Sequence, residues 1–342
     1  MYCSASIPTF EPRFPWILRG QTLPPASSTH RLKKTLGSVV FMQIGSVHTN
    51  TEVDREGFLE LLGVLDLKPP VIVKPNWGTS NCFTESEILD WVLEAVGGDA
   101  LVVESYGWAR CEEALRNEGL GSKKRGDLRR SDEWFLRYSG VGEVLERHGV
   151  DYMNVTEENW GHRTADPEEV KGLVEAKYEP VAMEEMYAFV PERLLEMRGS
   201  DLLSLAKLKM WLPPFRASLT VKNFFGMIPG PGRLRYHGKK NSRIDQSIAD
   251  IYKIYESLFD VKGVVEAVFS ASVAESLRKV NVHEDPGFAS ASKQPLELDS
   301  VVAALLGLDP HELGYLEHAS GVFGEWDDEA VAQARDSGIK IL

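Results

Sequence analysis

Strand-length apolar runs alternate along the chain with segments of helical periodicity. The apolar runs occupy residues 39–45, 69–77, 100–108, 152–158, 202–206 and 262–272. Helical spacing is found in residues 54–66, 85–96, 112–148, 220–226, 244–258 and 311–319, and residues 295–307 are expected to be a strand end followed by a helix. This alternation predicts an α/β fold, with a mostly parallel sheet that carries helices on both faces.

The first residues follow neither pattern. Residues 1–35 contain scattered prolines and are predicted to form an irregular extension, whereas residues 36–342 form the α/β domain. A chain of 342 residues is compatible with one large domain or with two lobes. No apolar run approaches the length of about 18 residues that a membrane span needs, and the N-terminus lacks the pattern of a secretory signal. We therefore expect a cytoplasmic protein without membrane association.

The charge of the chain is unevenly distributed. The whole sequence has 51 acidic and 38 basic residues, a net charge of −13. Residues 202–244 contain nine Lys or Arg, one His and no Asp or Glu, although about six acids would be expected in a window of that length. The segment is also apolar and rich in Gly and Pro, so it is not typical of a solvated basic tail. It predicts a partly buried pocket for a small anionic ligand, while the acidic total argues against nucleic acid as a partner.

Polar side chains stand where three predicted strands end. Lys74 and Asn76 stand where the strand in 69–77 ends, and Glu104 ends the next strand. Lys207 and Lys209 follow the strand in 202–206. Ligands of open α/β sheets bind beyond the carboxyl ends of the strands. The topology therefore points to the same part of the chain as the missing acids.

The candidate chemistry belongs to lysines embedded in apolar sequence. Lys222, Lys74 and Glu104 are the candidate catalytic residues, because a lysine with a lowered pKa can act as base or nucleophile and a carboxylate can move a proton. The candidate ligand-binding residues are Asn76, Lys207, Lys209, Asn223, Arg233, Arg235, His237 and Lys239. The alternative is structural: lysines that extend around a core or pair with nearby acids, asparagines that bond a turn, and an ordinary surface loop around the arginines.

Metal chemistry has weaker support in the sequence. The three cysteines are scattered and form no C-x-x-C, so no iron–sulfur cluster is expected. The histidines show no paired ligand spacing, and no transition-metal site is assigned. Asp245, Asp250 and Asp299 are candidates for Mg²⁺ beside a bound phosphate. Asp299 also stands where it would satisfy the free N–H groups at the start of the following helix.

Several separated segments together resemble one known family, domain of unknown function 362. They are V-I-V-K-P-N (71–76), L-L-S-L-A-K-L-K (202–209), T-V-K-N-F-F-G-M-I-P-G (220–230), R-Y-H-G (235–238) and L-E-L-D-S-V-V-A-A-L-L-G-L-D-P (296–310). The resemblance covers residues 38 to 330 or thereabouts and implies an intracellular α/β fold without implying a reaction. Many members carry an added ferredoxin-like cysteine cluster, which this chain lacks.

This chain departs from the family pattern at two places. The family usually has Thr-His after K-L-K, where this chain has Met210 and Trp211. The family's glycine-rich loop, which begins with Asp, is replaced by residues 264–276, and Glu266 stands near the expected position of that Asp. These departures raise the question of a changed or lost activity.

The leading hypothesis is an enzyme that acts on a small metabolite bearing a carboxylate or phosphate. A binding protein for an anionic cofactor, without catalysis, is the main alternative. An iron–sulfur accessory of electron transfer is a third, which the missing cysteines oppose.

Overall fold

The computed structural model describes residues 41–107, 110–111, 119, 124–213, 216–230, 233–276, 279–339 and 341–342. The strands are β1 Phe41–Ile44, β2 Val47–Asn50, β3 Val71–Lys74, β4 Ala100–Glu104, β5 Asp151–Asn154, β6 Asp201–Lys207, β7 Lys209–Met210, β8 Ala217–Ser218, β9 Asp260–Ala267, β10 Ser270–Ser276, β11 Lys279–Glu284 and β12 Phe288–Ser292. The α-helices are α1 Arg55–Leu65, α2 Ser86–Ala95, α4 Arg125–Tyr138, α5 Val141–His148, α6 Val155–Trp160, α7 Pro167–Glu175, α8 Glu192–Glu196, α9 Thr220–Asn223, α10 Leu234–His237, α11 Ile244–Leu258, α12 Pro295–Leu305, α13 Gly314–Phe323 and α14 Asp328–Asp336. Short 3₁₀ helices are η1 Glu184–Phe189, η2 Phe224–Met227, η3 Lys239–Asn241 and η4 Pro310–Glu312. The predicted extension, residues 1–35, lies outside the described residues.

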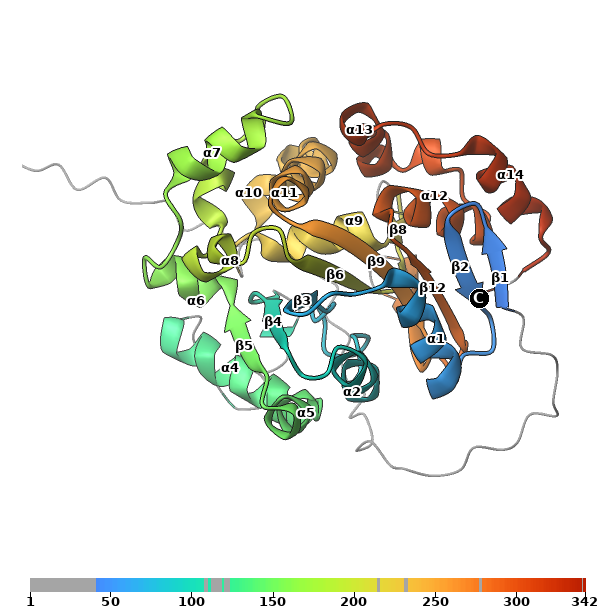
Figure 1. Cartoon of the computed structure of the whole chain (residues 1–342), viewed down its shortest axis with the longest axis horizontal. Coiled ribbons are helices and arrows are strands. Elements are labelled where there is room, and N and C mark those ends of the chain that lie inside the picture. The colour runs from blue at the N-terminus through green and yellow to red at the C-terminus, as the bar shows by residue number, and fades with distance from the viewer. Residues whose placement is uncertain are drawn as a thin grey trace, which may run out of the picture.

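One large sheet organises the described part of the chain (Figure 1). Its strand order is β1-β2-β12-β9-β6-β3-β4-β5. The five strands from β9 to β5 are parallel to one another, whereas β12, β2 and β1 continue the sheet in antiparallel fashion. The predicted α/β fold with a mostly parallel sheet is therefore confirmed.

Helices cover both faces of this sheet, and strand β6 shows why. Every residue of β6 is buried. Leu203 and Leu205 pack in a core with α1, α2, α4 and α5, while Leu202 and Ala206 pack in a second core with α7, α11, α12 and α13. Because successive side chains of a strand point to opposite faces, a strand between two helical layers is apolar throughout. Burying each leucine stabilises the fold by roughly 1.5–3 kcal/mol.

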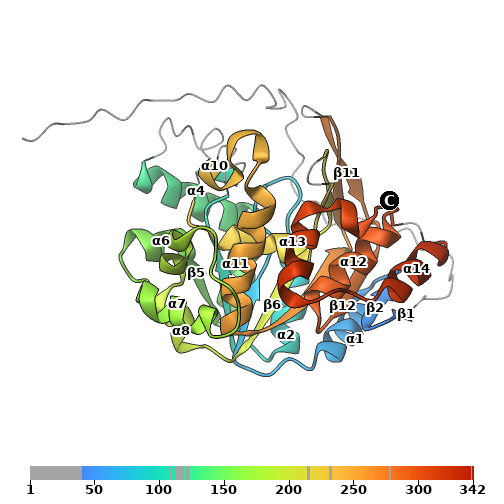
Figure 2. The ribbon, with the colours of Figure 1, turned by 90° about the horizontal axis from the view of Figure 1, so that it is seen from above.

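A smaller sheet adjoins the main one. Its order is β11-β10-β7-β8, and β7 begins two residues after β6 ends. Figure 2 shows β11 and α10 at the same edge of the molecule. Through β7, the smaller sheet follows directly on the carboxyl end of β6, where the sequence predicts the candidate site.

Three predicted elements need correction. The run at 262–272 is two strands, β9 and β10, which belong to different sheets. In the described part of the run at 39–45, strand β1 ends at Ile44, because the chain turns at Gly45 with φ +56° and returns as β2. Residues 295–307 hold no strand end, since Pro295 begins helix α12, as its fixed φ favours. Strands β7, β8, β11 and β12 and helices α6, α7, α8, α10 and α14 have no counterpart in the prediction. Among the described residues, no helix is both long and apolar enough to cross a membrane.

Candidate functional site

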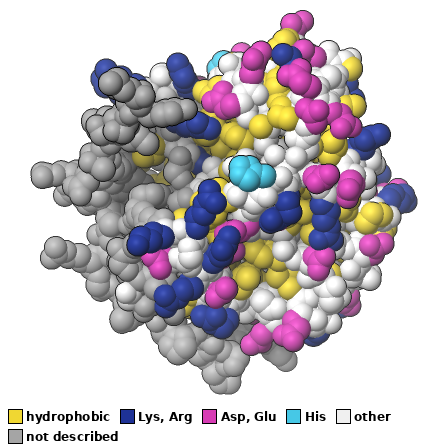
Figure 3. Space-filling view, turned by 90° about the vertical axis from the view of Figure 1, so that its left-hand side faces the viewer, with side chains coloured by type: hydrophobic (Ala, Val, Ile, Leu, Met, Phe, Trp, Pro, Cys, Tyr) yellow, Lys and Arg dark blue, Asp and Glu magenta, His cyan; other side chains and the backbone are white. Residues whose placement is uncertain are grey.

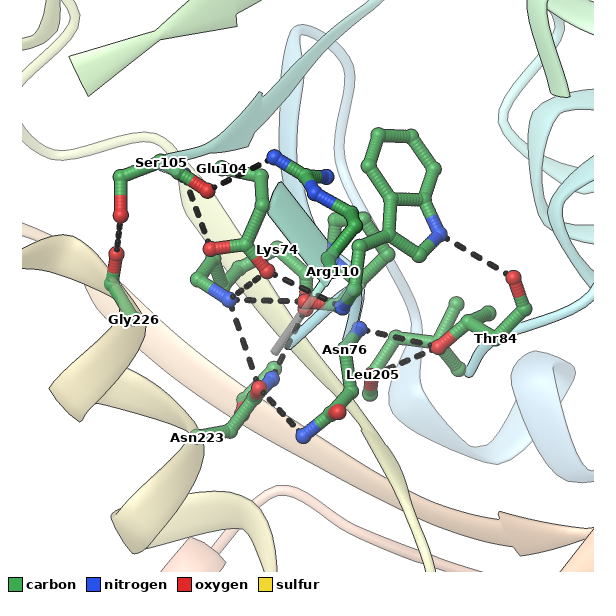
Figure 4. Close-up of polar contacts among 12 residues, drawn as sticks. Lys74, Asn76, Thr84, Glu104, Ser105, Arg110, Leu205, Asn223 and Gly226 are labelled. Atoms are coloured by element: carbon green, nitrogen blue, oxygen red, sulfur yellow. Dashed lines mark hydrogen bonds and ion pairs between the residues drawn. The ribbon is translucent and has the colours of Figure 1, made fainter. Parts of the chain in front are cut away.

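The carboxyl ends of three neighbouring strands bring the candidate residues together. Strand β3 lies between β4 and β6 and is parallel to both. Lys74, Glu104 and Lys207 are the last residues of these three strands, so they lie along one edge of the sheet. Figure 4 shows the polar contacts that radiate from Lys74 and Glu104. The strand ends therefore supply the framework of the site.

Lys74 and Glu104 form a buried ion pair. The Lys74 Nζ lies 2.9 Å from Glu104 Oε2, and the two side chains are 1% and 4% exposed. Glu104 also accepts hydrogen bonds from the backbone N–H groups of Trp77, at 3.1 Å, and Ser105, at 2.8 Å. Burial raises the pKa of Glu104, but the positive charges of Lys74 and Arg110 outweigh it and leave that pKa below its ordinary value. Burial also lowers the pKa of Lys74, and the negative charge of Glu104 opposes this change.

Two asparagines extend this pair into a chain of hydrogen bonds. Asn223 Oδ1 accepts from Lys74 Nζ at 3.3 Å and from Asn76 Nδ2 at 3.2 Å, while Asn223 Nδ2 donates to the Lys74 carbonyl at 3.0 Å. Asn76 Oδ1 in turn accepts from Lys209 Nζ at 2.7 Å. Both asparagines use their side chains to orient lysines. The network joins the end of β3 to α9 (Figure 4) and, through Lys209, to β7.

Gly226, in η2, lets the backbone approach the ion pair. A Cβ at this position would lie 2.7 Å from Lys74 Nζ and 2.9 Å from Glu104 Oε1. Its carbonyl accepts a hydrogen bond from Ser105 Oγ at 2.5 Å. No side chain fits between the backbone and the ion pair without displacing one of them.

Lys207 is held by two carboxylates. Its ammonium lies 2.6 Å from Glu85 Oε2 and 3.0 Å from Glu266 Oε2, and its side chain is fully buried. Burial, with the nearby charge of Glu85, raises the pKa of Glu266 to about 7 despite the attraction of Lys207. Lys207 and Lys74 thus both have the ion-pairing partners that the structural alternative predicted.

Lys209 differs from these two lysines because its partners are neutral. It is 3% exposed, and its ammonium donates to Asn76 Oδ1 and, at 3.2 Å, to Thr79 Oγ1. In the part of the chain that the structure describes, no carboxylate lies within ion-pair distance of it. Burial, together with the charge of Lys207, lowers the pKa of Lys209. A buried ammonium without a counterion is costly, so burial favours the neutral amine of Lys209 until an anion joins it.

Lys222, on α9, also has a lowered pKa. Burial is the main cause and the charge of Lys209 adds to it, so that the pKa falls to about 7 although Asp245 opposes the change. His237 lies close enough for the charge of Lys222 to lower its pKa further after burial. The His237 ring stands edge-on to Phe225, with 5.3 Å between ring centroids. Lys209, Lys222 and His237 thus form a group of bases that burial holds toward their neutral forms.

The remaining candidates are placed differently. Arg233 donates to the carbonyls of Ile228, at 2.7 Å, and of Tyr106 and Gly226, both at 3.2 Å, so it ties the loop to the end of β4. Burial lowers its pKa to about 10. Arg235 and Lys239 are exposed, and the Arg235 guanidinium lies over the ring of Tyr236 at 4.6 Å. These two do not join the buried group.

Of the three aspartates that the sequence offered for Mg²⁺, Asp250 and Asp299 have separate partners, whereas the buried Asp245 Oδ1 has no hydrogen-bond partner among the described residues. Asp250 accepts from Ala182 N at 2.9 Å. Asp299 lies inside α12 and accepts from the backbone N–H groups of Thr220 and Val221, both at 2.9 Å, so it caps α9 rather than its own helix. Within the described residues, no three His, Cys, Asp or Glu side chains gather as a metal site requires.

Sequence reasoning did not select three residues that shape the site. Thr79 holds Lys209, Glu85 holds Lys207, and Arg110 donates to the Ser105 carbonyl at 3.0 Å and lies 2.7 Å from Asp132 Oδ1. Glu85 stands at a predicted helix start, which was its only signal. Arg110 belongs to a highly charged stretch in which nothing local marks it for burial.

The surface on one side of the molecule carries mixed charges. Figure 3 shows basic and acidic side chains interspersed on the face where α6 and α7 lie. Two ion pairs of α6 are Arg129–Glu157, at 2.6 Å, and Arg163–Glu158, at 2.8 Å. This face is therefore not uniformly basic. The basic segment, residues 202–244, contributes its buried lysines at the strand ends instead.

Comparison with known proteins identifies the family. Neither the curated proteins nor the solved structures include a significant match to the chain. The model of the family described as "Domain of unknown function (DUF362)" matches residues 71–304, which span every strand end of the site. Because this match covers well over half of the sequence, the chain belongs to the DUF362 family.

Proposed function

We propose that this protein is an enzyme that binds a small metabolite bearing a carboxylate or phosphate, with Lys209 and Lys222 as the cationic contacts. The observation that carries the proposal is the position of Lys209, which is 3% exposed at the carboxyl edge of the sheet with an amide and a hydroxyl as partners. Burial of an uncompensated ammonium destabilises a fold. An anionic ligand supplies the missing counterion.

The two ion pairs have a supporting role in this proposal. Lys74 and Glu104 are occupied with each other and fix Asn223, which aligns Asn76 against Lys209. Lys207 is occupied by Glu85 and Glu266. Neither pair offers a free charge, so in this proposal their part is to hold Lys209 in place.

Lys222 is the proposed base or nucleophile. A pKa of about 7 leaves roughly half of its amines neutral at neutral pH. When an anion binds beside Lys209, its charge favours the protonated form of Lys222, so ligand binding is coupled to proton uptake. The enzyme would then return this proton to the substrate or to a leaving group.

Thermal unfolding in the presence of phosphates, nucleotides and di- and tricarboxylates tests the proposal at constant ionic strength. A ligand at 100 times its Kd adds about 2.7 kcal/mol of stability, which raises the midpoint by several degrees for a chain of this size. Lys209→Met should abolish the shift, whereas Lys293→Met, which removes an exposed lysine, should leave it unchanged. A panel without any selective shift contradicts the proposal.

Turnover separates the enzyme from a binding protein. The active anion is incubated with the protein and recovered for mass spectrometry, beside the Lys222→Met variant. An enzyme changes the anion and the variant does not, while a binding protein returns it unchanged in both cases. The second result would retain the anion site and remove the catalytic role of Lys222.

A further inference from the structure

A second hollow, lined by carboxylates, lies at the turn between β1 and β2. Its volume is about 410 Å³. Its wall includes Gly45 from the turn, Glu297 from α12, and Glu325, Trp326 and Asp327 from the segment before α14. None of the residues on its wall is a Lys, Arg or His. The hollow is therefore strongly acidic.

Glu297 is the residue that needs an explanation. It is 6% exposed, and its Oε2 accepts from the backbone N–H of Asp327 at 2.8 Å. Its Oε1 is buried without a hydrogen-bond partner among the described residues. Buried carboxylate oxygens are nearly always hydrogen-bonded, because leaving one unpaired costs the full desolvation penalty. The second oxygen is thus available to a ligand.

The geometry of Gly45 shows where that oxygen faces. A Cβ at Gly45 would lie 2.9 Å from Ala330 Cβ, 3.0 Å from Glu297 Oε1 and 3.9 Å from Asp327 Oδ2. The two oxygens therefore both face the Gly45 backbone at the wall of the hollow. Glu297, Glu325 and Asp327 take part in no ion pair within the described chain. Burial, and then the charge of Asp327, raise the pKa of Glu297, which is the sign of an uncompensated negative charge.

We propose that this hollow binds a primary ammonium compound, with a short alkyl diamine as the class that it fits. One ammonium would donate to Glu297 Oε1 and Asp327 Oδ2, and the second would reach Glu325 at the rim. A primary ammonium has three N–H donors and so satisfies two oxygens at once. Trp326 adds an aromatic ring to the wall, and rings of this type attract cations.

A divalent cation fits the same wall less well. Ca²⁺ takes six to eight oxygen ligands and Mg²⁺ needs octahedral geometry. Only two carboxylate oxygens face the Gly45 backbone, and no group of three metal-binding side chains forms among the described residues. The volume of about 410 Å³ also exceeds what a bare ion occupies. An organic diamine would pair with the carboxylates and also occupy the volume of the hollow.

Isothermal titration with 1,4-diaminobutane tests this site, with NaCl to match ionic strength. We expect one-site binding that is at least tenfold tighter than binding of tetramethylammonium, which has no N–H donor. Glu297→Gln should weaken the diamine at least tenfold. Glu60→Gln, which removes an exposed carboxylate from α1, should change it less than twofold, and Lys209→Met should also leave it unchanged.

Four results would overturn the proposal. They are diamine binding by Glu297→Gln at wild-type strength, equal binding of tetramethylammonium, displacement of the diamine by an equal concentration of Mg²⁺ or Ca²⁺, and no binding to the wild type at millimolar diamine. If Glu297→Gln does not fold, Asp327→Asn replaces it. This variant retains the oxygen that accepts from Glu329 N and should still lose at least tenfold in diamine affinity.

Discussion

Lys222 is expected to be the lysine most readily acylated near neutral pH. Its pKa of about 7 makes half of its amines neutral at pH 7, whereas an ordinary lysine with a pKa near 10.4 is neutral in roughly one molecule in 2,500. The gain in neutral amine is about 1,000-fold. A less basic amine is also a weaker nucleophile, and a Brønsted slope of about 0.45, as found for thiols, reduces the gain to about 40-fold.

The assay is brief acetylation with limiting reagent, followed by peptide mass spectrometry. Lys222 is partly exposed, so a small reagent reaches it, and Lys177 and Lys293 serve as exposed references. The rate at Lys222 should level off above pH 7, while the rates at the references rise tenfold per pH unit. The preference for Lys222 should therefore shrink as pH rises and vanish in urea.

The dependence of the Lys222 acetylation rate on pH is the decisive measurement. Acetylation of Lys222 at pH 7 no faster than Lys293, or a tenfold rise per unit up to pH 9, would refute the argument that burial lowers its pKa. An anion that occupies the site should slow Lys222 and leave Lys177 unaffected. That protection would connect the reactive lysine with the proposed ligand.

Three further outcomes follow from the same geometry. Gly226→Ala should lower the free energy of unfolding in denaturant by about 1–3 kcal/mol, because the added Cβ would lie 2.7 Å from Lys74 Nζ. Gly172→Ala on α7 is the control and should not destabilise the protein, because its Cβ would meet nothing within 4 Å. Glu104→Gln should cost about 3–5 kcal/mol, since it leaves the Lys74 charge buried without a counterion, and adding Lys74→Met should recover part of that loss; strictly additive costs would contradict the pairing. Stability should rise with pH between about 7 and 10, because the unfolded state, with an ordinary lysine pKa, binds more protons there than folded Lys222 does. Lys222→Met should reduce this slope, to which the lowered pKa values of Lys74 and Lys209 also contribute; an unchanged slope in the variant would contradict the lowered pKa of Lys222.

Local sequence was sufficient to find the edge of the sheet where the site lies. An apolar run that stops at Lys74, Glu104 or Lys207 indicates a strand end without knowledge of its neighbours, because burial on two faces needs only apolar residues in succession. Helix α11 was predicted with its observed bounds, since Ile248 and Tyr252 mark its buried face. Parallel pairing then places these strand ends together.

Local sequence did not predict a strand of weakly hydrophobic residues, nor an ion pair between residues distant in the chain. Strand β12 is F-A-S-A-S, whose small residues are buried by the neighbouring strands β2 and β9 rather than by their own hydrophobicity. The segment 202–244 lacks acids, yet Glu85, 122 positions from Lys207, folds back to pair with it. A count of the charges within one segment of the sequence does not include a partner so distant in the chain.

Residue type and short periodicity were enough to predict the α/β class, the strand ends and the lysines that gather there. Which of these lysines are neutralised became known from the folded chain, since ion pairing depends on distances of a few ångströms between residues far apart in the sequence. Glu104 and Glu266 occupy Lys74 and Lys207, whereas Lys209 is left with Asn76 and Thr79. The proposed anion contact is therefore Lys209, because the folded chain leaves it with neutral partners.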